Sequence, residues 1–167
     1  MRLTPIGVIR TPFVTISDMP IQPSGAAGVG GTIELDPELA EGLQDLDGFS
    51  HIIVLYQFHQ VKRRDLTVTP FLDPRPRGVF ATRAPTRPNP IGLSVLKLID
   101  IAGHRLAVEN VDMLDGTPLL DIKPYVPAFD RPAEPVRSGW LAQSGERAIT
   151  LRSDQRFGGS ASKGTDP

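Results

Sequence analysis

The sequence predicts an all-β protein: a small antiparallel β-barrel with short helices in its loops. Short stretches rich in β-branched and aromatic residues follow one another at fairly even spacing, as in closed antiparallel sheets. The 167 residues include 16 glycines and 17 prolines, a content usual for proteins built from short strands and turns. No strand alternates with a long helix and no G-x-G-x-x-G motif follows a strand, which argues against a Rossmann-type fold.

The N-terminal part of the chain is expected to contain three strands and one helix. The strands are expected over residues 6–9, 32–35 and 49–59. Residues 17–31 contain many Pro, Gly and Ala residues and are expected to form a loop. A helix of one or two turns is expected over 37–46, because Asp36 can cap its N-terminus and Pro37 suits its first position. Residues 49–59 are apolar on both faces, which is typical of a central strand.

Further strands are expected over residues 66–71, 93–101, 105–111 and 119–126, with a last one over 148–151. Residues 102–104 contain Gly103 and are expected to join two of these strands as a hairpin. Pro124 interrupts the 119–126 stretch, and since proline cannot donate to a ladder, this strand is expected at a sheet edge or a corner.

The predicted domain organisation has three parts. Residues 1–130 are expected to form the barrel domain. Residues 131–157, rich in Pro, Arg, Ser and Gly, are expected to form a C-terminal extension that packs on the barrel through Trp140 and Leu141. Residues 158–167 are rich in Gly and Ser and are expected to be disordered.

Composition excludes several classes of function. A net charge of −1 gives no overall attraction to nucleic acid, so any RNA contact must come from a local basic patch. The absence of cysteine excludes disulfides, thiolate catalysis and cysteine-ligated zinc, and the three histidines lie at no metal-ligand spacing, so no metal site is expected. No segment has the length of a membrane span or the pattern of a signal peptide. We therefore expect a soluble, cytoplasmic protein without membrane association.

Residues 78–94, which we name the arginine loop, carry the strongest functional signal. Three prolines alternate with Arg83, Arg87 and Asn89. Because proline fixes φ, the loop should be stiff and should hold its guanidinium groups in place. Two guanidiniums on a rigid loop suit a planar or anionic ligand such as a nucleotide. A proline-rich surface turn with solvated arginines is the alternative.

More basic residues lie close to the arginine loop. Arg75 and Arg77 precede it, and a second basic cluster over residues 62–64 follows His59 and Gln60 at the end of an expected strand. If these side chains face one cleft, they would form a rim that follows phosphates. Alternatively, they are solvated charges that protect a sheet edge, and His59 is an ordinary strand-end residue.

The aspartate-rich segment, residues 111–125, carries the second functional signal. It contains a turn signature that begins at Asp115. Beyond this turn Asp121, Lys123 and Tyr125 are spaced by two, so they share one face of a strand and could handle protons or position a substrate. The alternative is an outer polar face with an Asp–Lys pair, with Asp115 simply capping the turn.

Together the arginine loop, residues 48–51, residues 58–60 and residues 115–125 resemble the TsaA-like family, over roughly residues 3–129. Its characterised members are S-adenosylmethionine-dependent methyltransferases that modify N6 of threonylcarbamoyl-adenosine at position 37 of tRNA. The resemblance implies an antiparallel β-barrel, a homodimer, S-adenosyl-L-methionine as cofactor and the anticodon loop of tRNA as substrate. Larger members have an additional C-terminal domain that is not expected here.

The resemblance also implies roles for individual residues. The cofactor site is expected to contain Pro20, Ile21, Gln22, His59, Gln60, Arg83, Leu93, Asp112, Met113, Leu114 and Asp115. At position 21 the family pattern has arginine where this chain has isoleucine. The tRNA is expected to contact Arg75, Arg77, Arg87 and Asn89. Asp121 or Tyr125 is expected to deprotonate the weakly nucleophilic acceptor nitrogen, and Lys123 to stabilise the resulting anion.

Two alternatives stay open. The first is an S-adenosylmethionine-dependent methyltransferase that acts on a small molecule or on another RNA, which Ile21 and the shorter chain favour. The second is a regulatory module that binds the cofactor without catalysis. Formation of S-adenosylhomocysteine with an RNA pool separates the regulatory module from the two enzymes.

Overall fold

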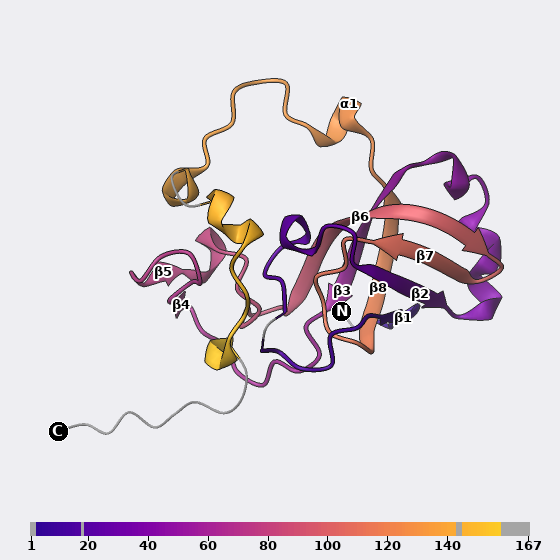
Figure 1. The fold of residues 1–167 in the computed structure, drawn as a ribbon. Coiled ribbons are helices and arrows are strands. Elements are labelled where there is room, and N and C mark those ends of the chain that lie inside the picture. Colours follow the sequence, from indigo (N-terminus) through magenta and orange to yellow (C-terminus); the bar gives the residue numbers. More distant parts are fainter. Residues whose placement is uncertain (1–2, 18, 143–144, 158–167) are drawn as a thin grey trace.

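Six antiparallel strands close a barrel in the order β1-β2-β7-β6-β3-β8 (Figure 1). The computed structural model describes residues 3–17, 19–142 and 145–157. The barrel strands are β1 (Gly7–Arg10), β2 (Gly30–Leu35), β3 (His51–Gln57), β6 (Ile91–Ala102), β7 (Arg105–Glu109) and β8 (Thr117–Pro124). The predicted all-β barrel is therefore confirmed.

The other elements are short. Two two-residue strands, β4 (Thr67–Val68) and β5 (Arg77–Gly78), pair outside the barrel. The α-helix α1 covers Pro127–Asp130. The 3₁₀ helices are η1 (Pro23–Ala26), η2 (Pro37–Leu43), η3 (Leu46–Gly48), η4 (Val79–Ala81), η5 (Gly139–Leu141), η6 (Gly145–Ile149) and η7 (Gln155–Phe157). Within the described residues, no helix is long and apolar enough to cross a membrane.

The barrel interior is apolar because alternate residues of each strand point inward. Along β3, Ile52, Val54 and Tyr56 are buried, while the intervening Ile53 and Leu55 are only half-buried. Fully buried residues of other strands complete the interior: Ile9, Ile33, Leu96, Leu106 and Leu119. Burial of each such side chain contributes about 1.5–3 kcal/mol relative to exposure.

Strand β8 closes the barrel, which corrects the expected edge position. It pairs with β1, where Gly7 lies opposite Leu119, and with β3, where Ile52 lies opposite Pro124. Pro124 is the last residue of the strand, so its missing N–H costs the ladder little. The next residue restores the pairing, since the Tyr125 N–H donates to the His51 carbonyl at 3.0 Å.

The hairpin expected at residues 102–104 joins β6 to β7. Ala102 pairs with Arg105 across a two-residue turn, and Gly103 has a φ of 62°. A side chain is disfavoured at such a positive φ, which explains the glycine.

Three expected elements differ in the structure. The 37–46 segment forms 3₁₀ turns instead of one helix, and the Asp36 side chain makes no capping hydrogen bond. The 66–71 strand is limited to β4, because Pro70 cannot extend a ladder. The 148–151 strand is wrong: η6 occupies this region, and the N–H of Leu151 is satisfied locally by the Arg147 carbonyl at 3.0 Å. The predicted disordered tail, 158–167, lies outside the described residues.

Candidate functional site

A cavity of about 780 Å³ lies against one side of the barrel. Its walls come from segments far apart in the sequence: residue 16, residues 19–24, 56–61 and 70–72, the arginine loop, and residues 112–117, 140–141 and 148–157. The volume falls within the range of small-molecule sites, and most of the lining is apolar with a few polar groups.

A chain of buried polar groups lies at the barrel side of this cavity. Ser94 of β6 donates from Oγ to Asp112 Oδ1 at 2.7 Å, and the hydroxyl of Tyr56 on β3 lies 3.2 Å from the same Ser94 Oγ. Tyr56 and Asp112 line the cavity. These hydrogen bonds satisfy polar atoms that burial would otherwise penalise.

Asp112 is the electrostatic centre of the site. Burial raises the pKa of its carboxyl to about 6, against the opposing effects of the Ser94 hydrogen bond, its own backbone amide and the Arg83 charge. Burial, and secondarily the Asp112 charge, also raises the pKa of Tyr56 far above its usual value, so the phenol stays protonated. Asp112 is therefore ionised above about pH 6 and supplies a negative charge to the cavity.

Gly92 allows the Tyr56 ring to lie against β6. A Cβ built on Gly92 would lie 2.3 Å from Tyr56 Cε2, a distance at which the ring would have to move. Phe58 packs edge-on against the same ring at 5.4 Å between centroids. The ring position therefore depends on a glycine that the arginine loop supplies.

Arg83 links two segments that the sequence assigned to the cofactor site. Its Nη1 donates to Gln22 Oε1 at 3.0 Å, and both residues line the cavity. Arg83 itself is exposed at the cavity mouth. A guanidinium there can bind a carboxylate or another planar anion.

Arg87 holds the arginine loop together from within. Its Nη1 donates to the carbonyls of Thr82 at 2.8 Å, Val79 at 3.2 Å and Ala84 at 3.4 Å. Its guanidinium also lies 5.7 Å from the centroid of the Phe80 ring. The stiffness predicted from prolines thus has a second source, since Arg87 ties successive turns of the loop to one another.

Arg75 and Arg77 converge on Asp73 and do not line the cavity. Arg75 Nη2 lies 3.2 Å from Asp73 Oδ2, and Arg77 Nη2 lies 2.5 Å from the same oxygen. Hydrogen bonds from Arg75, and then from Arg77, hold the pKa of Asp73 well below its usual value. Asn89 is exposed and also lies outside the lining. Of the residues expected to contact tRNA, only Arg87 lines the cavity.

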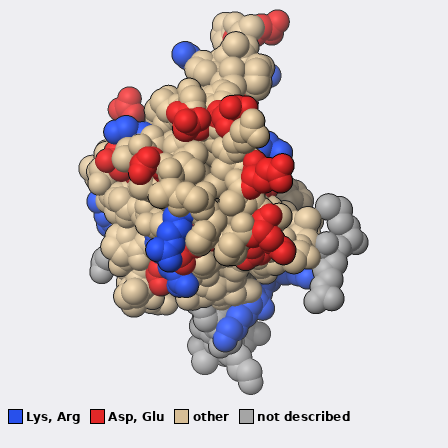
Figure 2. Space-filling model, turned by 90° about the vertical axis from the view of Figure 1, so that its right-hand side faces the viewer, with Lys and Arg blue, Asp and Glu red and all other residues tan. Residues whose placement is uncertain are grey.

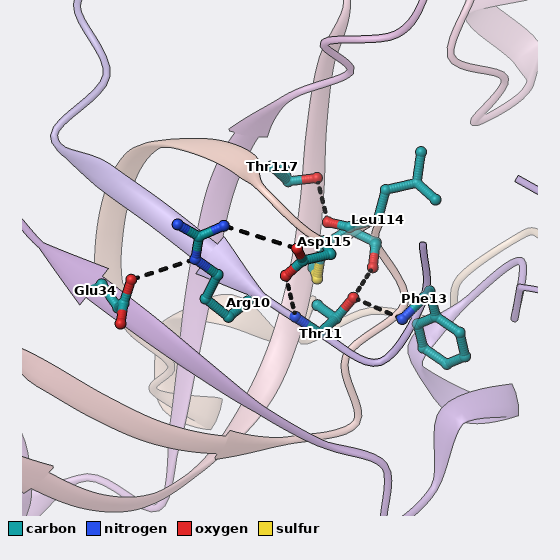
Figure 3. Close-up of polar contacts among 8 residues, drawn as sticks. Arg10, Thr11, Phe13, Glu34, Leu114, Asp115 and Thr117 are labelled. Carbon is teal, nitrogen blue, oxygen red and sulfur yellow. Dashed lines mark hydrogen bonds and ion pairs between the residues drawn. The ribbon is translucent and has the colours of Figure 1, made fainter. Parts of the chain in front are cut away.

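Asp115 belongs to a structural network (Figure 3). Its Oδ1 accepts the Thr11 N–H at 3.1 Å and its Oδ2 lies 3.7 Å from Arg10 Nη1. Thr11 Oγ1 in turn donates to the Met113 carbonyl at 2.9 Å. These contacts tie the aspartate-rich segment to the end of β1, and Asp115 does not line the cavity. The expected contact of Asp115 with the cofactor stays a prediction.

The predicted catalytic row lies on β8 and just beyond it, outside the cavity lining. Lys123 Nζ lies 2.6 Å from Asp121 Oδ2, so these two side chains form an ion pair, and the Tyr125 ring packs edge-on against His51 with centroids 6.5 Å apart. A catalytic role for the row stays a prediction.

The other expected cofactor residues all line the cavity: Pro20, Ile21, Gln22, His59, Gln60, Arg83, Leu93, Asp112, Met113 and Leu114. Sequence reasoning missed Tyr56 and Ser94. Tyr56 was counted as part of the apolar strand 49–59, and Ser94 as the last residue of the arginine loop. A tyrosine among core aliphatics was the available signal, because a buried phenol needs a hydrogen-bond partner.

The fold defines a class of small antiparallel β-barrel protein with a cavity at its side. Residues 8–131 match the family described as the tRNA-methyltransferase O N-terminal domain. The chain belongs to this family.

Relatives and solved structures agree with this assignment. A Pyrococcus abyssi protein named "probable S-adenosyl-L-methionine-binding protein" is 52% identical over 92% of this chain and 83% of its own length. The Escherichia coli "tRNA (adenine(37)-N6)-methyltransferase" is 37% identical over 86% of this chain and 64% of its own. The crystal structure of TrmO from Pseudomonas aeruginosa aligns with a TM-score of 0.70 at 42% identity, and the match covers 84% of this chain but 62% of that one.

Proposed function

We propose that this protein binds S-adenosyl-L-methionine in the cavity and methylates N6 of threonylcarbamoyl-adenosine at position 37 of tRNA. One observation carries the proposal: Arg83 of the arginine loop and Asp112 of the aspartate-rich segment, 29 positions apart in sequence, line the same cavity. The names of the Pyrococcus and Escherichia relatives support the cofactor and the substrate, respectively.

The residues present fit the cofactor. Asp112 offers a buried negative charge to the sulfonium or the amino group, and Arg83 offers donors to the carboxylate. Apolar residues such as Leu93, Met113 and Leu114 offer a dry surface to the adenine. When bound, the cofactor supplies a methyl group activated by a positively charged sulfur. The part of this chain is to align donor and acceptor and to exclude water.

A second candidate function is a non-catalytic cofactor-binding module. The observation that favours it is the ion pair between Asp121 and Lys123, which lies outside the cavity lining and engages the predicted base. In a methyltransferase, a base must remove the proton of the acceptor nitrogen. The sequence indicated Asp121 or Tyr125 as this base.

Calorimetry tests cofactor binding. S-adenosylmethionine should bind the wild-type chain, and Asp112→Asn and Arg83→Gln should each weaken it by about tenfold or more, the usual cost of losing a charged hydrogen-bond partner. Asp100→Asn is the matched control, since Asp100 is exposed on β6 and lies outside the lining. Absence of heat with the wild-type chain would contradict the proposal.

Product analysis separates the enzyme from the module. The wild-type chain is incubated with labelled cofactor and with tRNA from cells that do or do not make threonylcarbamoyl-adenosine. Methylation of only the first tRNA pool supports the proposed substrate, whereas binding without product in either pool supports the module. Asp121→Asn should lower turnover far more than cofactor affinity if the predicted base acts, and unchanged turnover would remove it from the mechanism.

A further inference from the structure

The wall of the cavity includes a segment beyond the family match. We name residues 139–157 the C-terminal strap, of which 143–144 are not described. Six strap residues line the cavity: Trp140, Leu141, Ala148, Ser153, Asp154 and Phe157. The family match ends at residue 131. We propose that the strap completes the binding site and that Trp140 stacks on a purine base held in the cavity, an inference that rests on the proposed function.

The strap is attached to the loop that forms one cavity wall. The Ser153 N–H donates to the Met19 carbonyl at 2.8 Å, and Ser153 Oγ donates to the Ile16 carbonyl. Arg152 forms an isolated antiparallel bridge with Pro20. Pro20 is one of the residues expected at the cofactor site, so the strap fixes the position of that segment.

The strap is also attached to a second segment of the cavity lining, residues 70–72. Arg156 Nη1 donates to the Pro70 carbonyl at 2.9 Å, and its guanidinium lies 4.6 Å from the centroid of the Phe71 ring. Phe157 is buried and packs edge-on against Phe71 at 5.2 Å between centroids. The strap therefore contacts two segments of the cavity lining, and Figure 1 shows it beside β4 and β5, away from the β6–β7 turn.

Trp140 is held in one orientation. Its Nε1–H donates to the carbonyl of Ala81, a residue of the arginine loop, at 2.8 Å. The Arg77 guanidinium lies 5.3 Å from the centroid of the indole ring, and Asp73 binds that guanidinium in turn. The chain Asp73–Arg77–Trp140 therefore fixes the indole before a ligand enters.

A fixed, half-buried indole at a cavity wall is a stacking surface. Aromatic side chains recognise bases by their faces, and a surface already held in place loses little entropy on binding. The proposed function brings two purines to this cavity, the adenine of the cofactor and the adenine of the acceptor nucleoside. Both present the face of a purine ring to the indole. A fluorescence titration distinguishes the cofactor from the acceptor nucleoside as the source of that ring.

Trp140 is the only tryptophan of the chain, so its fluorescence reports directly on the strap. Titration of the wild-type chain with S-adenosylmethionine should change the emission, and titration with methionine, which has no purine, should not. This result assigns the purine to the cofactor. If the cofactor binds by calorimetry without changing the emission, and tRNA added to the saturated protein then changes it, the purine is that of the acceptor.

Variants separate stacking from wall packing. Trp140→Leu keeps apolar bulk without an aromatic face and should weaken binding of the assigned purine by about tenfold, whereas Trp140→Phe should stay close to wild type. Phe129→Ala is the matched control, because Phe129 is 75% exposed on α1 and lies outside the lining. Thermal unfolding midpoints confirm that each variant is folded.

Two results would overturn the inference. The first is that the cofactor binds, that no ligand changes the emission, and that Trp140→Leu binds cofactor and tRNA as tightly as the wild type. In that case the inference about the strap fails, while the proposed function stands. If the wild-type chain gives no heat with the cofactor, the proposed function fails and the inference fails with it.

Discussion

At the scale of single residues, the charged form of Asp112 lowers the stability of the folded protein because its carboxylate is buried. A carboxylate buried without a full ionic partner disfavours its own charged form, and this is why its pKa rises to about 6. The same charge is what a cationic ligand would bind. If the proposed cofactor binds here, the site keeps a group that is unfavourable for folding and useful for binding, as is common at functional sites.

Asp112→Asn should stabilise the protein at neutral pH. In the folded protein this carboxyl keeps its proton up to about pH 6, whereas in the unfolded chain it loses it at about pH 4, so stability falls as the pH rises between these values. Above about pH 6 the Asp112 carboxyl is ionised in the folded protein, so the full free-energy cost of burying its charge is present. The substitution should then raise the free energy of unfolding by up to about 3 kcal/mol, with little effect below about pH 4.

Urea denaturation at about pH 7.5 and at about pH 3.5, on either side of this window, measures the difference. The asparagine side chain would keep an oxygen acceptor for Ser94, so the comparison isolates the charge. Asp100→Asn, at an exposed position, should change stability by less than about 0.5 kcal/mol at both pH values. A variant that is less stable than the wild type at the higher pH would show that the Asp112 charge is compensated inside the protein.

At the scale of elements, barrel closure depends on how closely β1 approaches its neighbours. Gly7 pairs with Leu35 of β2 on one side and with Leu119 of β8 on the other. A Cβ built on Gly7 would lie 2.3 Å from the Glu34 carbonyl oxygen and 2.9 Å from the Leu35 Cα. Both contacts are with backbone, which cannot rotate away as a side chain can.

Gly7→Ala should therefore destabilise the barrel by about 1–3 kcal/mol or more, the cost of overpacking a well-packed site. Chemical denaturation followed by circular dichroism measures the loss. Gly48→Ala is the control, because nothing lies within 4 Å of a Cβ built there. Equal stability of the two variants would mean that β1 can move away from β2 at no cost.

At the scale of the whole molecule, the net charge of −1 gives no overall attraction to RNA, so single exposed arginines matter. Figure 2 shows both Asp or Glu and Lys or Arg side chains on the face that lies on the right of Figure 1. Arg75, on the segment before β5, has a side chain that is 75% exposed. If the proposed function holds, we expect Arg75 to contact a phosphate of the bound RNA.

Binding of tRNA should weaken steeply as salt increases, because each phosphate contact releases counterions. Arg75→Gln should reduce the slope of log K against log salt by roughly 0.7–0.9, the contribution of one phosphate contact. Arg105→Gln is the matched control: its side chain is 61% exposed, and it lies at the β6–β7 turn, away from β4 and β5 (Figure 1). Filter binding over a salt series gives both slopes, and equal slopes for Arg75→Gln and wild type would exclude a phosphate contact.

The sequence by itself determined the all-β class, the β6–β7 hairpin and the two segments that carry the charged groups. These are local properties: alternation of apolar residues, a glycine at a positive φ and the fixed φ of proline all act within a few residues. Arg83 could be named from its proline-rich loop, whereas Asp112 was named through the resemblance to the TsaA-like family.

Only the tertiary structure decided how these parts are used. Strand β8 pairs with β1 although the two strands lie near opposite ends of the barrel sequence, and no local pattern records such a pairing. The chain Tyr56–Ser94–Asp112 exists because β3, β6 and the segment after β7 meet at one cavity. Burial at that cavity raises the pKa of Asp112. The hydrogen bonds of Asp115 with Thr11 and of Arg87 with Thr82 likewise appear only in the folded chain, as do the contacts that hold the strap at the cavity. Burial and long-range pairing depend on the whole fold, so they follow from the closed barrel and not from any segment alone.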